Sequence, residues 1–242
     1  MTLFSSVILG LIQGITEFLP ISSSGHLAIA EHLLHTGGMK TPEFFDVLLH
    51  LGTLVAVFIA YWSDIRDMIV ELIAGARDLA RRSTPNPVPP ARRLILLIIV
   101  GTLPLFAVLP VKELVEGLGD NMYFVAGALL VTGCLLFASD RVKKGRKTEK
   151  SATLVDALLV GVGQAIATCP GISRSGTTIS VGMMRGFDRA FAVRFSFLMS
   201  LPAVLGANVL EIKDALASNF PIEELPMYLV GVAVSAVVGY FA

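Results

Sequence analysis

The sequence predicts an all-α integral membrane protein that forms a single membrane domain over residues 1–242. The chain is 54% hydrophobic and only 16% charged, whereas a soluble domain carries about 25% charged residues. Its mean hydropathy is +0.75. The apolar residues also gather in uninterrupted runs of the length that a helix needs to cross a bilayer. The 19 basic residues balance the 19 acidic ones, so nucleic acid is not an expected partner.

Five apolar runs carry few or no charges and are expected to span the membrane. They cover residues 44–62, 94–111, 122–139, 195–210 and 226–242. The last run stops without a polar flank, so we expect the natural chain to continue into a further membrane helix. Residues 64–80 show helical spacing of apolar residues beside charged ones, which predicts a helix along the interface. A proline-rich linker follows at residues 83–90.

The charges of the loops predict the direction of each run. Two loops are basic and contain Arg77, Arg81, Arg82, Arg92 and Arg93 in the first, and Arg141, Lys143, Lys144, Arg146, Lys147 and Lys150 in the second. Two others, residues 112–121 and 211–225, each hold one lysine among acidic residues. By the positive-inside rule the basic loops face the cytoplasm and the acidic loops face outward.

Two apolar stretches then have to begin and end on the same side of the membrane. Residues 3–34 begin and end outside, and residues 152–187 begin and end inside. Both are therefore expected to be re-entrant helical hairpins, each broken in its middle. Such a break is tolerated at bilayer depth only where it is buried in protein or lines a wet cavity.

The two hairpins align with each other when the sequence is shifted by 151 positions. The identities concentrate at glycine and polar positions and include Gly10 with Gly161, Gln13 with Gln164, Ile21 with Ile172, Ser22 with Ser173, Ser24 with Ser175, and Gly25 with Gly176. We therefore expect internal repeats over approximately residues 1–80 and 152–242. Because the hairpins enter from opposite sides, this is an inverted-topology repeat whose hairpin tips meet near the midplane, with about five or six spanning helices around them.

The most informative stretch is residues 170–178, which read P-G-I-S-R-S-G-T-T. An arginine at bilayer depth costs roughly 2.5–3.5 kcal/mol, so it usually faces a cavity and a partner. Glycines beside hydroxyls let backbone N–H groups turn toward an anion, and Arg174 can offer a two-pronged fork to phosphate oxygens. These residues predict a buried phosphate-binding loop. The alternative is a polar kink that only packs helices together.

The first hairpin offers a carboxylate, a hydroxyl and an imidazole. Gln13 and Glu17 are four residues apart and so share a helical face. A buried carboxylate stays ionised only beside a cation, so we expect Glu17 and Gln13 to hold Mg²⁺ or Ca²⁺ together with phosphate oxygens. The alternative is a neutral Glu17 that hydrogen-bonds a neighbouring helix.

An imidazole exchanges protons near neutral pH, and His26 lies close enough to Ser23 and Glu17 in the sequence to act as an acid or base. The remaining histidines, His32, His35 and His50, have no such neighbours and are interpreted as interfacial or packing residues. The two cysteines, Cys134 and Cys169, lie in apolar runs and indicate no disulfide framework.

At these residues the chain resembles the bacitracin-resistance type of undecaprenyl-diphosphate phosphatase. The (Glu/Gln)-x-x-x-Glu motif of that family matches residues 13–17, and its Pro-Gly-x-Ser-Arg-Ser-x-x-Thr motif matches residues 170–178. The resemblance runs over essentially the whole chain. Gln13 is within the family pattern but supplies one carboxylate fewer for a metal.

The resemblance implies hydrolysis of undecaprenyl diphosphate to the monophosphate and inorganic phosphate. This reaction recycles the lipid carrier of cell-wall synthesis and confers bacitracin resistance, since the drug sequesters the diphosphate. It also implies a bacterial cytoplasmic (inner) membrane location, with a site that opens to the periplasmic face, where the diphosphate carrier is released. The partners are the polyprenyl diphosphate substrate and membrane lipids, and a homo-oligomer is left open.

The predicted residues can carry this chemistry. Arg174 would hold the diphosphate and stabilise charge on the transferred phosphoryl group. Ser23 would be the nucleophile or would position it, with Glu17 or His26 as the base. The groups expected to bind the diphosphate beside Arg174 are Ser22, Gly171, Ser173, Ser175, Gly176 and Thr178. A phosphoserine intermediate and direct attack by a metal-activated water both stay open.

Two other functions compete with the phosphatase. A transporter of a phosphate-like anion or a lipid phosphate also uses inverted repeats with broken helices, and fold alone does not decide function. A non-catalytic lipid-diphosphate binding protein is a weaker alternative. The nucleophile and base set distinguishes the enzyme, because a transporter needs binding groups only.

Overall fold

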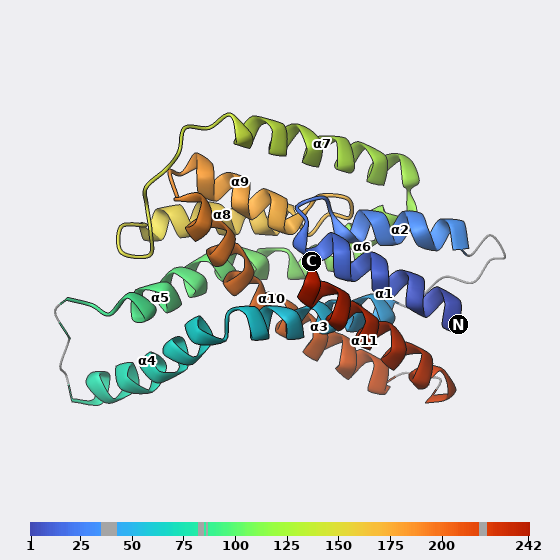
Figure 1. The fold of residues 1–242 in the computed structure, drawn as a ribbon, viewed down its shortest axis with the longest axis horizontal. Coiled ribbons are helices and arrows are strands. Elements are labelled where there is room, and N and C mark those ends of the chain that lie inside the picture. Colours follow the sequence, from blue (N-terminus) through green and yellow to red (C-terminus); the bar gives the residue numbers. More distant parts are fainter. Residues whose placement is uncertain (35–42, 82–84, 86, 218–221) are drawn as a thin grey trace.

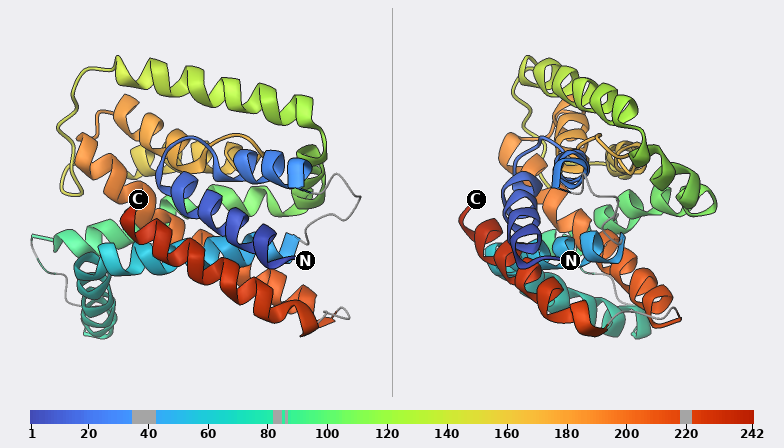
Figure 2. Two further views of the ribbon diagram at one scale, coloured as in Figure 1. Left: turned by 45° about the vertical axis from the view of Figure 1, so that its right-hand side comes forward. Right: turned by 90° about the vertical axis from the view of Figure 1, so that its right-hand side faces the viewer.

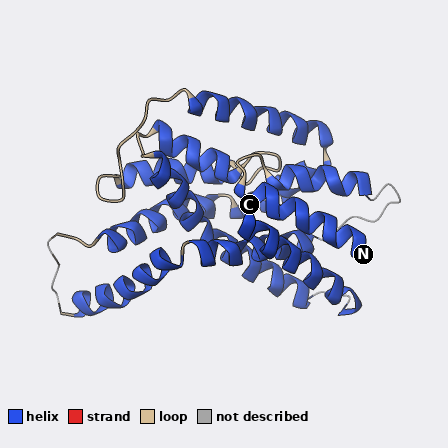
Figure 3. Cartoon of the chain, in the orientation of Figure 1, coloured by secondary structure: helices blue, strands red, loops and turns tan. Residues whose placement is uncertain are grey.

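The computed structural model describes residues 1–34, 43–81, 85, 87–217 and 222–242, and every regular element in this part is a helix (Figure 3). The all-α prediction is confirmed. The α-helices are α1 (Leu3–Phe18), α2 (Ser23–Leu34), α3 (Glu43–Ala60), α4 (Trp62–Ala80), α5 (Pro90–Thr102), α6 (Lys112–Gly117), α7 (Met122–Asp140), α8 (Leu154–Ile166), α9 (Arg174–Met184), α10 (Arg189–Ala217) and α11 (Leu225–Phe241). Short 3₁₀ segments are η1 (Leu103–Ala107), η2 (Leu109–Val111), η3 (Leu118–Asp120) and η4 (Ile222–Glu224). His35, residues 83, 84 and 86 of the linker at 83–90, and part of the connection at 211–225 lie outside the described residues.

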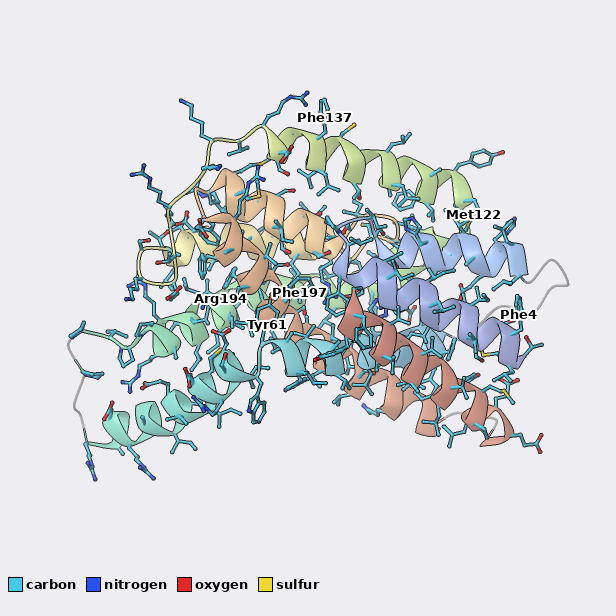
Figure 4. All side chains as sticks on the ribbon, in the orientation of Figure 1. Phe4, Tyr61, Met122, Phe137, Arg194 and Phe197 are labelled. Atoms are coloured by element: carbon cyan, nitrogen blue, oxygen red, sulfur yellow. The ribbon has the colours of Figure 1, made fainter. Side chains whose placement is uncertain are left out.

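Three helical segments of the described chain are long and apolar enough to cross a membrane. They are Pro90–Asp120, Met122–Asp140 and Arg189–Leu210, and they contain three of the predicted runs. The bent pair of α3 and α4 would add a fourth span, and α1, α8 and α11 are shorter apolar helices. Large apolar side chains such as Phe4 and Phe137 are exposed on the outside (Figure 4). The protein is therefore a multi-pass membrane protein.

The chain bends sharply at Tyr61, between α3 and α4. The two helices meet at 82°, and α4 extends to the lower left of Figure 1, where it contacts α5. The Tyr61 ring stacks on Phe197 of α10, with ring centroids 6.1 Å apart. One turn earlier on α10, Arg194 donates to Asp64 Oδ1 at 3.2 Å (Figure 4). These contacts fix the bend, and the predicted helix at residues 64–80 is present.

Small residues bring α1, α3 and α11 into close contact. A Cβ at Gly10 would lie 2.6 Å from Gly231 O, and one at Gly52 would lie 2.6 Å from Val232 O. In a membrane the hydrophobic effect does not drive helices together, and small residues that let the backbones approach closely promote helix association instead. Across the same interface Ser235 Oγ donates to Leu49 O at 2.8 Å. This packing holds the face of α1 that carries the predicted site.

A second group of helices holds the other half of the site. A Cβ at Gly161 of α8 would lie 2.2 Å from Gly101 O of α5. Asp156, at the start of α8, is fully buried and accepts hydrogen bonds from Lys147 Nζ at 2.8 Å and Arg185 Nε at 2.9 Å. Arg185 follows the end of α9, so its bond to Asp156 joins the end of α9 to the start of α8. Helix α7 lies along the outer side of α2 and α9 (Figures 1 and 2).

Candidate active site

The break between α1 and α2 has an unusual backbone at Ser22. Its φ is +73°, a left-handed conformation that is uncommon outside glycine and often marks a functional site. Ser22 Oγ accepts a hydrogen bond from Gly25 N at 3.2 Å, which satisfies one of the free N–H groups in the first turn of α2. The break therefore turns sharply and leads directly into Ser23.

The break between α8 and α9 is braced by α7. Thr132 Oγ1 donates to Gly171 O at 3.1 Å and accepts from Ser173 N at 3.0 Å. Gly171 has a φ of +91°, and a Cβ there would lie 2.7 Å from Ala128 Cβ, so only glycine fits. Ser173 Oγ then caps α9 by accepting from Gly176 N at 3.0 Å. Thr132 had not been identified from the sequence, where it is a lone hydroxyl within an apolar run.

The two breaks are in contact. A Cβ at Gly25 would lie 3.1 Å from Gly171 Cα, and one at Gly176 would lie 2.9 Å from Pro20 O. The two breaks therefore lie against each other, and the closer prediction that residues 22–26 approach residues 173–177 stays a prediction.

The centre of the site is the carboxylate of Glu17, which is only 9% exposed. Arg174 Nη2 donates to Oε1 of Glu17 across 157 positions of sequence. The other oxygen, Oε2, accepts from Ser23 Oγ at 2.7 Å and from Gln13 Nε2 at 3.1 Å. The Glu17 carboxylate thus lies beside the Arg174 cation and accepts a hydrogen bond from the Ser23 hydroxyl. A hydroxyl that donates to a carboxylate is the arrangement of a nucleophile and its base.

His50 of α3 belongs to this cluster. Its Nε2 lies 3.5 Å from Glu17 Oε2, and its Nδ1 lies 2.8 Å from Asp46 O. A carbonyl oxygen can only accept, so Nδ1 carries a proton and Nε2 is the atom directed at the carboxylate. The interpretation of His50 as an interfacial or packing residue is therefore wrong. A polar side chain within a membrane-length run was the available signal.

Two predicted site residues have other contacts. His26 Nδ1 donates to Ser22 O at 2.7 Å, and no hydrogen bond in the described part of the chain joins His26 to Ser23 or Glu17. Thr178 Oγ1 lies 2.6 Å from Ser196 Oγ and also donates to Arg174 O at 2.9 Å. Thr178 thereby braces α9 against α10. The roles of His26 as a base and of Thr178 as a phosphate ligand stay predictions.

A cavity of about 830 Å³ opens onto this cluster. The polar residues of its lining include Glu17, Ser22, Ser23, Ser24, His50, Ser173, Arg174 and Ser175. Much of the apolar lining comes from residues 105–109, at η1 and η2, and from residues 202–210 of α10, and it includes Leu105, Phe106, Val108, Leu109, Val204 and Leu205. The cavity combines an anion-binding group with a long apolar wall.

The two predicted metal ligands lie side by side, but no group of three or more His, Cys, Asp or Glu residues that could hold a metal occurs among the described residues. Gln13 Oε1 is buried and has no hydrogen-bond partner within the described chain. This free oxygen and the Glu17 carboxylate are hard ligands of the type that Mg²⁺ and Ca²⁺ prefer. The donor set is compatible with a divalent cation whose other ligands are phosphate oxygens and water.

Comparison with known proteins agrees with the motifs. The family model for bacitracin resistance protein BacA matches residues 6–242. The chain belongs to the BacA family. An undecaprenyl-diphosphatase of Alkaliphilus metalliredigens is 42% identical over 247 residues, which cover 100% of this chain and 88% of that protein. The undecaprenyl-diphosphatases of Methanosphaera stadtmanae and Thermodesulfovibrio yellowstonii are 41% and 35% identical, over 99% of this chain in each case and 87% and 85% of their own lengths. Membership of the BacA family confirms the resemblance inferred from the two motifs.

Proposed function

We propose that this BacA-family protein is an undecaprenyl-diphosphate phosphatase, which recycles the lipid carrier of cell-wall synthesis and thereby confers bacitracin resistance. The observation that carries the proposal is the Glu17 carboxylate, which binds the Ser23 hydroxyl and the Arg174 guanidinium at once. Nucleophile, base and phosphate-binding cation thus meet in one cluster on the cavity wall. The relatives named undecaprenyl-diphosphatase support the same activity.

The cavity suits an amphiphilic diphosphate. Arg174 and the hydroxyls of residues 173–175 would bind the phosphates, and the apolar lining from η1, η2 and α10 would hold the first part of the prenyl chain. A water-soluble diphosphate would leave this apolar wall in contact with water, at a cost set by its area. The substrate class is therefore a polyprenyl diphosphate.

In the reaction, the two halves of the site have separate tasks. Ser23 Oγ attacks the terminal phosphorus while its proton passes to Glu17 Oε2, and the bond from that phosphorus to the bridging oxygen breaks. The lipid monophosphate leaves with the bridging oxygen, and water then hydrolyses the phosphoserine to inorganic phosphate. In the alternative, Ser23 only positions a water that attacks directly. In both, Arg174 stabilises the charge that builds on the phosphoryl oxygens.

The transporter alternative is not favoured. A transporter needs groups that bind its cargo, whereas the hydrogen bond from Ser23 to Glu17 provides a nucleophile and a base that binding alone does not require. The relatives also carry the name of a hydrolase. Fold alone would have left the question open.

We further propose that the chain is an inverted repeat of two re-entrant hairpins. Helices α1 and α8 begin at Leu3 and Leu154, and α2 and α9 begin at Ser23 and Arg174, so each pair is offset by the shift that aligns the sequence. The capping bonds recur as well, because Gly25 N donates to Ser22 Oγ and Gly176 N donates to Ser173 Oγ. These matches support a common origin of residues 1–80 and 152–242.

A divalent cation is proposed as a cofactor, held by Glu17 and Gln13 Oε1 together with phosphate oxygens. Bound there, it would neutralise charge on the diphosphate. We expect EDTA to abolish phosphate release from undecaprenyl diphosphate by the protein purified in detergent, and Mg²⁺ or Ca²⁺ to restore it. Glu17→Gln should blunt the restoration. Full activity in EDTA would remove the metal from the mechanism, and an absence of phosphate release under every metal condition would contradict the proposed function itself.

The site is proposed to open to the periplasmic face of the bacterial cytoplasmic membrane. The acidic outer loops do not attract a diphosphate, but screening limits their reach to roughly 8 Å at physiological salt. The location of the substrate, which is released on the outer leaflet, therefore weighs more than the charges of the loops.

Labelling of a single cysteine tests this orientation. Ser24 lines the cavity, so Ser24→Cys, after removal of Cys134 and Cys169, should react with a membrane-impermeant thiol reagent in intact cells. Lys143→Cys in the basic loop is the matched control and should react only in inside-out vesicles. Labelling of the Ser24→Cys protein only in inside-out vesicles would overturn the proposed orientation.

A further inference from the structure

Gln164 of α8 has a buried amide without a partner. The residue is 1% exposed, and neither Nε2 nor Oε1 forms a hydrogen bond with any residue that the structure describes. Because both atoms are unpaired, exchanging the amide nitrogen and oxygen would not change this result. A buried amide without hydrogen bonds destabilises the fold, so its presence calls for an explanation.

The position of Gln164 in the structure suggests an explanation for its unpaired amide. It lines the same cavity as Glu17, Ser23 and Arg174. Two other buried side chains without partners, Thr177 and Ser180, are absent from the described lining of that cavity. Gln164 is therefore part of the wall of the space in which a ligand is bound, and its amide is unpaired within that wall.

The internal repeat shows why this amide is free. Its counterpart Gln13 donates through Nε2 to Glu17 Oε2 at 3.1 Å. In the second half the position of Glu17 is taken by Thr168, whose hydroxyl donates to Ala165 O at 2.7 Å. Gln164 is thus left without the acceptor that its counterpart has in the protein.

The chemistry of the free atoms indicates the ligand. A diphosphate presents many acceptor oxygens, and Arg174 spends Nη2 on Glu17, so a further donor on the cavity wall would add to the N–H groups that Arg174 keeps for phosphate. The Gln164 amide nitrogen is such a donor, and its oxygen can accept from a protonated phosphate oxygen or from water. Asn208 also lines the cavity, but its Nδ2 donates to Val204 O at 2.9 Å and only its oxygen is free, which does not suit a phosphate.

We propose that Gln164 is a substrate-binding residue whose amide nitrogen donates a hydrogen bond to a phosphate oxygen of the lipid diphosphate. The inference rests on the proposed phosphatase function. It adds to the two sequence motifs a group from α8 that neither motif contains.

The test replaces Gln164 with methionine, which has a similar volume and no polar amide. Loss of a hydrogen bond to a charged group should raise KM for undecaprenyl diphosphate about 10- to 100-fold, with a much smaller change in kcat. Removal of the unpaired buried amide should at the same time raise Tm of the ligand-free protein in detergent. The stabilisation that added inorganic pyrophosphate gives to the wild type should shrink. A purely structural role for the amide would not produce weaker substrate binding together with a higher Tm.

Ser180→Ala is the matched control, because it removes a buried, unpaired hydroxyl away from the cavity and should leave KM unchanged. Gln164→Leu serves as a second variant if the methionine variant does not fold. Wild-type KM in either folded Gln164 variant would overturn the inference, including the case in which Tm falls because the amide only holds a structural water. The wild type tests the proposed function separately, since that function fails only if the wild type itself releases no phosphate.

Discussion

Replacement of Arg174 with lysine is expected to lower kcat/KM for undecaprenyl diphosphate by about 100-fold or more, because loss of a single preorganised donor to a developing charge already costs that much. Lysine keeps the positive charge but loses the planar fork of five N–H donors. Arg174 spends Nη2 on Glu17 and keeps its other donors for phosphate. A lysine ammonium can serve the carboxylate or the phosphate with good geometry, but not both.

The variant should still insert and fold, since the positive charge beside Glu17 is retained. Steady-state phosphate release in detergent measures the loss, and a thermal unfolding curve checks the fold. Arg141→Lys is the matched control. Arg141 is exposed in a solvated loop beside Phe137, with its guanidinium 3.4 Å from the ring centroid, and its replacement should have no measurable effect on turnover. Near-normal turnover of Arg174→Lys would show that the arginine is structural.

Much of the site could be predicted from the sequence because polar residues stand out in apolar surroundings. Glu17, Ser23 and Arg174 were each identified from their cost at bilayer depth or from the motif around them, and the repeat predicted that their loops meet. The repeat relates positions and not side-chain directions. It therefore does not predict that Arg174 turns toward Glu17 and donates to its carboxylate.

His50 was missed for a related reason. Its sequence neighbours are apolar, and its role depends on how α3 rotates against α1, which the close contacts of Gly10, Gly52 and α11 decide. Helical spacing within one segment cannot give that rotation. The change of direction after residues 44–62 follows from the sequence, which predicts a spanning run there and an interfacial helix over residues 64–80. The contact that fixes the bend, between Tyr61 and Phe197 of α10, joins distant parts of the chain and could not be predicted.

Replacement of Ser23 with alanine is expected to lower kcat about 10³-fold or more with little change in KM, as for the removal of a nucleophile that acts together with its base. The Ser23 hydroxyl lies 2.7 Å from Glu17 Oε2, so alanine leaves the base without a proton donor while Arg174 still holds the phosphates. Ser180→Ala is the matched control, because its buried hydroxyl has no hydrogen-bond partner among the described residues and is absent from the described lining of the cavity. Acid quenching of the wild type during turnover separates the two mechanisms. Phosphate covalently bound at Ser23 would identify Ser23 as the nucleophile. If no phosphate is bound there and Ser23→Ala still loses kcat, Ser23 positions the attacking water. A Ser23→Ala protein that keeps most of the wild-type kcat would exclude both roles.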